Sequence, residues 1–154
     1  MMSYKVQLTP APVSLPLNGT LSVGGALAGK VKRLEQELQE LPQTIVNPAE
    51  HVHGGVYART GMIPAGTTFI GAVHRKNHIN IVCGDVSIAT DGGTLRLVGY
   101  HVLPANAGSK RIAYAHADTM WTTLAQTGLT NFREIEDELV EDSSQLQTRQ
   151  HQKD

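Results

Sequence analysis

Three histidines and one arginine between positions 74 and 116 are the side chains best suited to chemistry. His74 and His78 flank the short polar segment 75–77, and His116 follows later in a segment that also contains Arg111. If residues 75–77 form the turn of a hairpin, the two imidazoles face each other, and His116 could join them from a third strand. Three neutral imidazoles with an open coordination position can bind Zn²⁺, Fe²⁺ or Ni²⁺. A divalent transition metal is therefore one hypothesis for this region.

Strand parity bears on the role of His116. In an ideal strand Arg111 shares one face with Ala113 and Ala115, and His116 shares the other with Tyr114. A bulge near Ala115 would turn His116 to the face of Arg111. The other hypothesis, that these histidines are polar pocket or surface residues, therefore stays open.

Arg111 favours a different kind of site. A guanidinium is always charged and its fork matches carboxylate or phosphate groups. Burying it is costly unless it is paired, and the acidic residues nearest the expected strands, Asp85, Asp91 and Asp118, lie at strand ends or turns. An inward-facing Arg111 predicts an anionic ligand. The alternative is a surface salt bridge beside Lys110.

Further side chains are candidates for the same pocket. Aromatic walls with a few convergent polar groups are typical of ligand sites, and Tyr57, Arg59, Tyr114 and Trp121 could supply them. Ordinary packing of strand residues explains each of them equally well. The segment 51-HVHGG-55 places two imidazoles on one side of an extended chain. We expect it to be a connector or a contact with a neighbouring subunit, with a ligand pair as the alternative.

The periodicity of the chain indicates which elements position these residues. Apolar residues at positions 27, 31, 34, 38 and 41 form a helical stripe, which Pro42 ends. Seven segments rich in β-forming residues follow, at 56–63, 67–73, 78–83, 85–90, 94–99, 110–116 and 119–125, with Gly, Pro and Asp between them. Short strands at this spacing predict an all-β barrel or sandwich.

These patterns divide the chain into four parts. We expect an extended arm at 1–25, an amphipathic helix at 26–42, a β-barrel at 43–130, and a short C-terminal helix near 131–140 within 131–154, followed by a disordered tail. The helix either packs on its own domain or forms a short coiled coil between subunits.

Composition narrows the function classes. The 154 residues carry a formal net charge of −1 and 18% charged residues, which gives no electrostatic reason to expect nucleic-acid binding. The single cysteine, Cys83, has apolar neighbours and is predicted to be a buried thiol, which fits a reducing compartment. We see no stretch of about 20 apolar residues and no secretory signal, so we expect a cytoplasmic protein that does not insert into membranes.

Two segments resemble the sequence motifs of the cupins. The first is 66-GTTFIGAVHRKNHINIVCG-84 and the second is 99-GYHVLPANAGSKRIAYAH-116, and the resemblance extends roughly over 56–124. It implies a closed jelly-roll barrel with a metal site at its mouth. His74 matches the second histidine of the first motif and His78 replaces its glutamate. Arg111 stands at the histidine of the second motif. More narrowly, the chain resembles small cupin-like proteins of tailed phages.

The function expected from these observations is a homo-oligomeric binding protein without efficient turnover. Its pocket would hold an anionic or metal-coordinated small molecule, with His74, His78 and His116 as metal candidates and Arg111 as anchor. In a phage setting it would sequester a host metabolite or signal in the host cytoplasm. Two alternatives stay open: a metal-dependent cupin enzyme, either a dioxygenase or an isomerase, and a structural or virion-associated scaffold.

Overall fold

The computed structural model describes residues 25–90 and 93–150, with side chains over 29–90 and 93–149. Nearly all of the predicted arm and the end of the tail lie outside these ranges. The elements in chain order are α1 (Gly25–Gln39), β1 (Ala49–His53), β2 (Val56–Ile63), β3 (Thr68–Ile70), β4 (His78–Thr90), β5 (Gly93–Ala105), β6 (Ile112–Ala115), β7 (Thr119–Gln126), α2 (Phe132–Leu139), the 3₁₀ helix η1 (Ser143–Gln145) and α3 (Gln147–Gln150).

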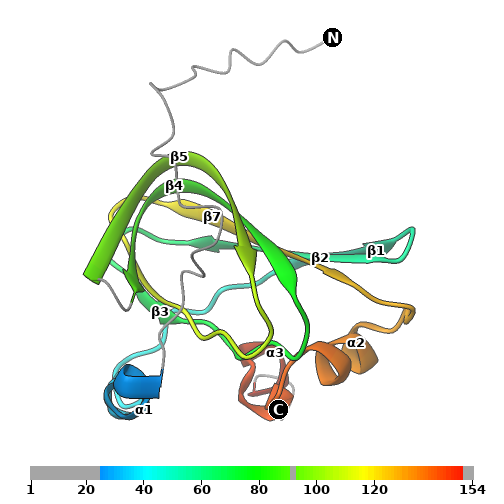
Figure 1. The fold of residues 1–154 in the computed structure, drawn as a ribbon, viewed down its shortest axis with the longest axis horizontal. Helices are drawn as coiled ribbons and strands as arrows, with labels where there is room; N and C mark the ends of the chain where they lie inside the picture. The colour runs from blue at the N-terminus through cyan, green and yellow to red at the C-terminus, as the bar shows by residue number, and fades with distance from the viewer. Residues whose placement is uncertain (1–24, 91–92, 151–154) are drawn as a thin grey trace, which may run out of the picture.

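All seven strands belong to one antiparallel sheet, which confirms the all-β prediction. The strand order is β1-β2-β7-β4-β6-β3, and β5 pairs with the remaining edge of β4. The sheet curls strongly, consistent with a jelly roll, so that β4 and β5 arch over the interior (Figure 1). Among the described residues, β1 and β3 stand at the two ends of the strand order and do not pair with each other. The sheet is therefore an open half-barrel, whereas the resemblance implied a closed barrel.

Strand β4 organises the sheet because it pairs with three others. It pairs with β5 along its whole length, and its other edge pairs first with β7 and then with β6. Gly84 lies between those two partners. A Cβ atom there would come within 2.8 Å of the Thr119 Cα atom. This glycine therefore permits a close approach of backbones inside one long strand, where the sequence had suggested a turn.

Two other segments differ from expectation. β1 is a paired strand that includes part of the segment 51–55, which was predicted to be a connector or a subunit contact. β5 continues to Ala105 through a region predicted to be a loop, and it includes Pro104. Proline is tolerated there because one edge of β5 has no partner strand among the described residues, so the missing N–H breaks no ladder.

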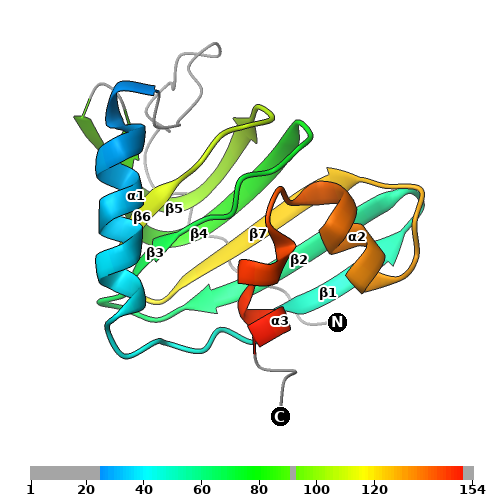
Figure 2. The same ribbon diagram turned by 90° about the horizontal axis from the view of Figure 1, so that it is seen from below.

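The helices cover the open side and one end of the sheet. α1 lies beside β3 and β6 (Figure 2), where Val31 is buried and Lys110 Nζ donates to Glu35 Oε2 at 2.6 Å. α2 begins at the N-cap Asn131, whose side chain accepts two backbone N–H groups. The chain after α2, predicted to be disordered, forms η1 and α3. None of the described helices is long and apolar enough to cross a membrane.

Two apolar clusters fill the inner side of the sheet. The first lies under the arch and consists of Val82, Val86, Ile88, Leu97, Leu103 and Ala113. The second lies between the sheet and α2 and consists of Tyr57, Ala125, Ile135, Leu139 and Val140. Even positions of β4 face inward and odd positions face outward. Cys83 is therefore exposed, and the prediction of a buried thiol was wrong.

Candidate functional site

The loop that carries His74 is held in place from two sides. On one side, the Arg75 backbone N–H donates to the Leu139 carbonyl at 2.7 Å, at the end of α2. On the other side, the Gly108 N–H donates to the His74 carbonyl at 2.8 Å. His78 follows as the first residue of β4 and points inward. The loop therefore has a defined conformation, because α2 and the connection between β5 and β6 both hold it.

The rings of His74 and His78 lie close together, as predicted, but residues 75–77 do not form the turn of a hairpin, because β3 pairs with β6 and not with β4. Their ring centroids are 4.1 Å apart and their planes differ by 31°. Each Nδ1 bonds to the backbone carbonyl two residues earlier, at 3.1 Å from Ala72 and 3.0 Å from Lys76. A carbonyl can only accept, so each Nδ1 carries the hydrogen and each neutral ring presents its Nε2 lone pair.

The surroundings keep both imidazoles neutral near pH 7. Burial, followed by the proximity of His78, lowers the pKa of His74 to about 4, and the guanidinium groups of Arg59 and Arg111 act in the same direction. Burial also lowers the pKa of His78, and Arg111 adds to that effect. A base with a pKa near 4 removes protons weakly at neutral pH.

Arg111 is the least compensated charge in this part of the molecule. Arg111 immediately precedes β6 in the sequence, and the residue is only 5% exposed. Nη2 donates to the Pro104 carbonyl at 3.2 Å, whereas Nε and Nη1 are buried and have no partner within residues 25–90 and 93–150. Burial lowers the pKa of Arg111 to about 10, so the guanidinium remains charged at neutral pH. The sequence had left the direction of this side chain open, and the structure turns it inward.

Asn80 adds a polar group on the same inner face of β4, two residues after His78. Its Oδ1 accepts from Trp121 Nε1 at 3.2 Å and from Thr123 Oγ1 at 3.0 Å. Because the indole N–H is only a donor, these bonds fix the orientation of the amide. No hydrogen bond between described residues uses the Asn80 amide nitrogen. Trp121 therefore orients a donor group on the inner face.

Arg59 and Tyr57 also face inward, but both have partners within the protein. Arg59 Nη1 lies 2.9 Å from Oε1 of Glu136, which is 5% exposed and also binds Arg149 at 2.7 Å. The Tyr57 hydroxyl donates to Glu50 at 2.5 Å, and burial together with this bond raises the pKa of Tyr57. Neither side chain is available as a primary anchor, which distinguishes Arg59 from Arg111.

Two predicted site residues lie elsewhere. The pairing of β6 with β4 runs without a bulge, so His116 faces outward. Its Nε2 lies 2.7 Å from Ser87 Oγ, and its ring packs edge-on against Tyr114, which is exposed on the same outer face. The expected meeting of His116 with His74 and His78 does not occur, and Tyr114 does not line the site.

The side chains present do not fit a resident metal ion of the kind the cupin resemblance implied. In the described part of the chain no three His, Cys, Asp or Glu side chains come close enough to hold one. Two imidazoles alone leave a divalent ion short of protein ligands. The Arg111 guanidinium, which lowers the pKa of both rings, would also repel a cation bound to them. The pair His51 and His53 is exposed on the outer side of β1 and does not contribute.

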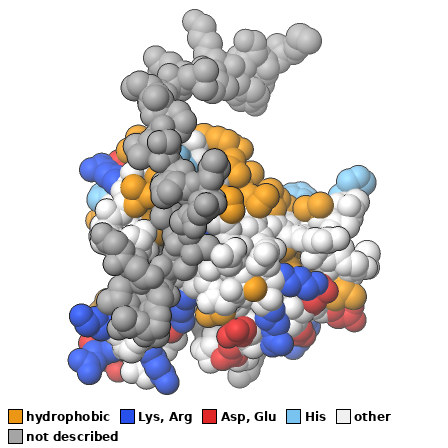
Figure 3. All heavy atoms as spheres, viewed as in Figure 1, with side chains coloured by type: hydrophobic (Ala, Val, Ile, Leu, Met, Phe, Trp, Pro, Cys, Tyr) orange, Lys and Arg blue, Asp and Glu red, His pale blue; other side chains and the backbone are white. Residues whose placement is uncertain are grey.

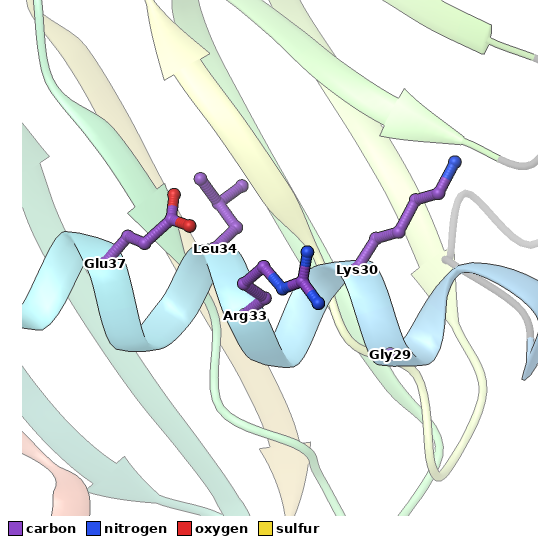
Figure 4. A pocket seen from close by; sticks show the side chains of 5 residues that line it. All are labelled: Gly29, Lys30, Arg33, Leu34 and Glu37. Atoms are coloured by element: carbon purple, nitrogen blue, oxygen red, sulfur yellow. The ribbon is translucent and has the colours of Figure 1, made fainter.

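A separate hollow lies along α1. It has a volume of about 360 Å³, and the described residues that line it are Gly29, Lys30, Arg33, Leu34 and Glu37. Lys30, Leu34 and Glu37 point to the same side of the helix (Figure 4). Apart from the half-buried Leu34 these residues are exposed. Since none of the described residues that line it is a buried polar group, the inner cluster of His74, His78 and Arg111 is the better candidate site.

Sequence reasoning missed two residues that matter for this site. Asn80 could have been found, because its place two residues after His78 in a strand puts both on one face. Glu136 could not have been found from the sequence. It lies 77 residues after Arg59, and no local pattern links α2 to that arginine.

Comparisons with known proteins concern the fold. No family model matches the chain, and no curated protein matches it. A cupin-2 domain protein from Shewanella frigidimarina is 13% identical over 65% of this chain and 98% of that one, with a TM-score of 0.44. A cupin superfamily protein from Desulfitobacterium hafniense is 15% identical over 59% and 85%, with a TM-score of 0.45. Ectoine synthase from P. lautus is 22% identical over 64% and 75%, with a TM-score of 0.46.

Proposed function

We propose that this protein binds a small anionic molecule on the inner side of its curled sheet, with Arg111 as the anchor. The observation that carries the proposal is a guanidinium that is 5% exposed and has two nitrogens without a partner among the residues that the structure describes. A buried charge of this kind is costly unless a counter-charge meets it. Among the described residues, the acidic side chains on the inner side are Glu50 and Glu136, and these already bind Tyr57, Arg59 and Arg149. The missing counter-charge then comes from a ligand.

The other polar groups define what else the ligand carries. The neutral rings of His74 and His78 each offer an Nε2 acceptor, and the Asn80 amide offers a donor. A carboxylate or phosphate that also bears hydroxyl groups would satisfy this set, with its anionic oxygens on Arg111 and its hydroxyls on the imidazoles. The low pKa of His74 makes it a weak base, which favours binding without turnover.

Thermal stability measured with a panel of small anions tests this proposal. In a chloride buffer, millimolar phosphate, citrate or a hydroxycarboxylate should raise the melting temperature of the wild type but not of an Arg111→Met variant. Lys110→Met is the matched control, because it removes the neighbouring cation, which pairs with Glu35 at the surface. An equal response of wild type and Arg111→Met to every anion would refute the proposal.

Native mass spectrometry and metal analysis of protein purified without chelator add a second readout. We expect a bound anion, or an empty chain, with metal well below one ion per chain. A stoichiometric metal that is lost in a His74→Ala/His78→Ala double variant would instead support the metal-dependent enzyme. The role in sequestering a host metabolite or signal stays a prediction from the phage resemblance.

A further inference from the structure

Two histidines lie next to each other on the outer face of β1, away from the candidate anion site. His51 and His53 are both exposed, whereas the alternating residues Glu50 and Val52 are half-buried. Residues two positions apart in a strand lie on the same face, with their Cα atoms roughly 7 Å apart. Figure 3, in the view of Figure 1, shows histidine side chains at the end of the sheet that carries β1. The two imidazoles are therefore placed to share one ligand.

A tight hairpin turn holds this strand in a defined register. His53 pairs with Val56 across a two-residue turn formed by Gly54 and Gly55. Both glycines have positive φ, at 57° and 79°, as the favoured two-residue turn requires. The Thr127 backbone N–H donates to the Gly55 carbonyl at 3.0 Å, which ties the turn to the chain after β7. The histidines therefore stand on an ordered strand and not on a loose connector.

The inner face of β1 determines which way the histidines point. Glu50 accepts a hydrogen bond from the Tyr57 hydroxyl, and Val52 packs against the second apolar cluster. Because these alternate positions are held inside, His51 and His53 are turned outward. Among the described residues, the side-chain hydrogen bonds and ion pairs of β1 are those of Glu50. The ring nitrogens of the two histidines are thus open to a ligand.

The surroundings of this pair suit a cation. The residues that face the two histidines across β2 and β7 are uncharged: Val56, Ala58, Leu124 and Gln126. Arg59 points to the other face of β2, where it pairs with Glu136. The inner imidazoles differ in this respect, because the Arg111 guanidinium lowers the pKa of both of them. A metal ion that the inner pair would repel through Arg111 therefore meets no such repulsion from the described residues around the outer pair.

We propose that His51 and His53 chelate a divalent transition-metal ion on the outer face of the β1–β2 hairpin, with the remaining coordination positions open to solvent. Imidazole nitrogen suits Cu²⁺, Ni²⁺ and Zn²⁺, and Cu²⁺ binds most tightly, whereas Ca²⁺ selects oxygen ligands. Structural zinc sites use four protein ligands, so a site with two exchanges its ion readily. Dialysis removes such an ion, which agrees with the low metal content expected of the purified protein. The proposal does not depend on the anion site.

Calorimetric titration of the full-length protein with Cu²⁺ tests the site. The wild type should bind one Cu²⁺ per chain at the hairpin and should give no binding heat with Ca²⁺. Because the second imidazole binds intramolecularly, His51→Gln and His53→Gln should each weaken Cu²⁺ binding about 100-fold. His116→Gln is the matched control, because it removes an exposed outer-face histidine that bonds to Ser87. A wild type that does not bind Cu²⁺, or an affinity that both hairpin variants leave unchanged, would overturn the proposal.

A substitution on β2 tests the geometry by adding a ligand. Ala58 lies directly across from His51, and the Cβ atoms of such cross-strand pairs are about 4.5–5.5 Å apart. Ala58→His should therefore add a third imidazole and tighten Cu²⁺ binding at least about tenfold. Val102→His is the matched control, because Val102 is 49% exposed on the outer face of β5, and β7 and β4 separate it from β2. An affinity that Ala58→His does not change would place the ion elsewhere and refute the proposal.

Nuclear magnetic resonance distinguishes the hairpin from the inner pair of histidines. Bound Cu²⁺ is paramagnetic and broadens the amide signals of residues close to it. We expect the signals of residues 49–58 to broaden at substoichiometric Cu²⁺, while those of residues 74–78 remain sharp. The reverse pattern would assign the ion to the inner imidazoles and exclude the proposed site.

Discussion

Replacing Arg111 by Met should stabilise the ligand-free protein, although it removes a buried polar side chain. Burial lowers the pKa of Arg111 from its ordinary value to about 10. Each pKa unit corresponds to about 1.4 kcal/mol, so the charged form destabilises the fold by roughly 3 kcal/mol near pH 7. The lost hydrogen bond to the Pro104 carbonyl contributes about 1 kcal/mol in the opposite direction. The net expectation is a gain of about 2 kcal/mol.

The sign of the pH dependence follows from the same shift. The folded state holds the Arg111 proton less tightly than the unfolded state does, so the penalty is complete well below pH 10 and falls as the pH rises through 10. The measurement at pH 7 therefore captures the full effect. For a chain of this length, about 2 kcal/mol corresponds to a rise in melting temperature of roughly 4–8 °C.

Arg59→Met is the matched control for this measurement. It is the same chemical change on the same inner side, but Arg59 pairs with the buried Glu136 at 2.9 Å. Removing one partner of a buried ion pair costs about 3–5 kcal/mol, and we expect the lower end because Arg149 still binds Glu136. Urea denaturation of the three proteins, dialysed free of small anions, gives the comparison. If both variants lose stability by similar amounts, Arg111 is compensated within the protein and the argument for a ligand fails.

Two further outcomes test the packing and the electrostatics. The pKa of His74 is about 4 in the folded protein and 6.5 ordinarily, so up to about 3 kcal/mol of stability present above pH 6.5 should disappear as the pH falls towards 4. The free energy of unfolding, measured with denaturant across this pH range, should depend much less on pH in His74→Gln than in the wild type. In the outer-face variant His116→Gln the dependence should be unchanged. Equal pH dependence in the two variants would contradict the burial assigned to His74. Gly84→Ala should destabilise the protein by more than about 2 kcal/mol, because the new Cβ meets the Thr119 backbone. Gly128→Ala, which has open space around it, should be nearly neutral in the same thermal melts, and a neutral Gly84→Ala would mean that β4 can move away from β7.

Much of the fold was predictable from local patterns. Alternating apolar residues and the turn formers between them located most of the strands, and the boundaries of β2 were predicted as observed. The same reasoning predicted that His74 and His78 lie close together, although the hairpin it assumed does not form, because β3 pairs with β6. It failed at Gly84, because a glycine that ends a strand and one that permits a close approach look alike in sequence. It failed at β1 because edge strands with polar residues resemble connectors.

The candidate site depended on information of a different kind. Strand parity determines that Arg111 and His116 lie on opposite faces, a conclusion available from their spacing alone. Which face turns inward is decided by how the sheet curls and where α2 packs. The partners of each charge are decided in the same way: Glu136 reaches Arg59 from the far end of the chain, and none of the described residues bonds to the Nε and Nη1 atoms of Arg111. Local periodicity constrains neighbours one or two residues apart, whereas charge compensation in the interior depends on contacts between distant segments, and these exist only once the chain has folded.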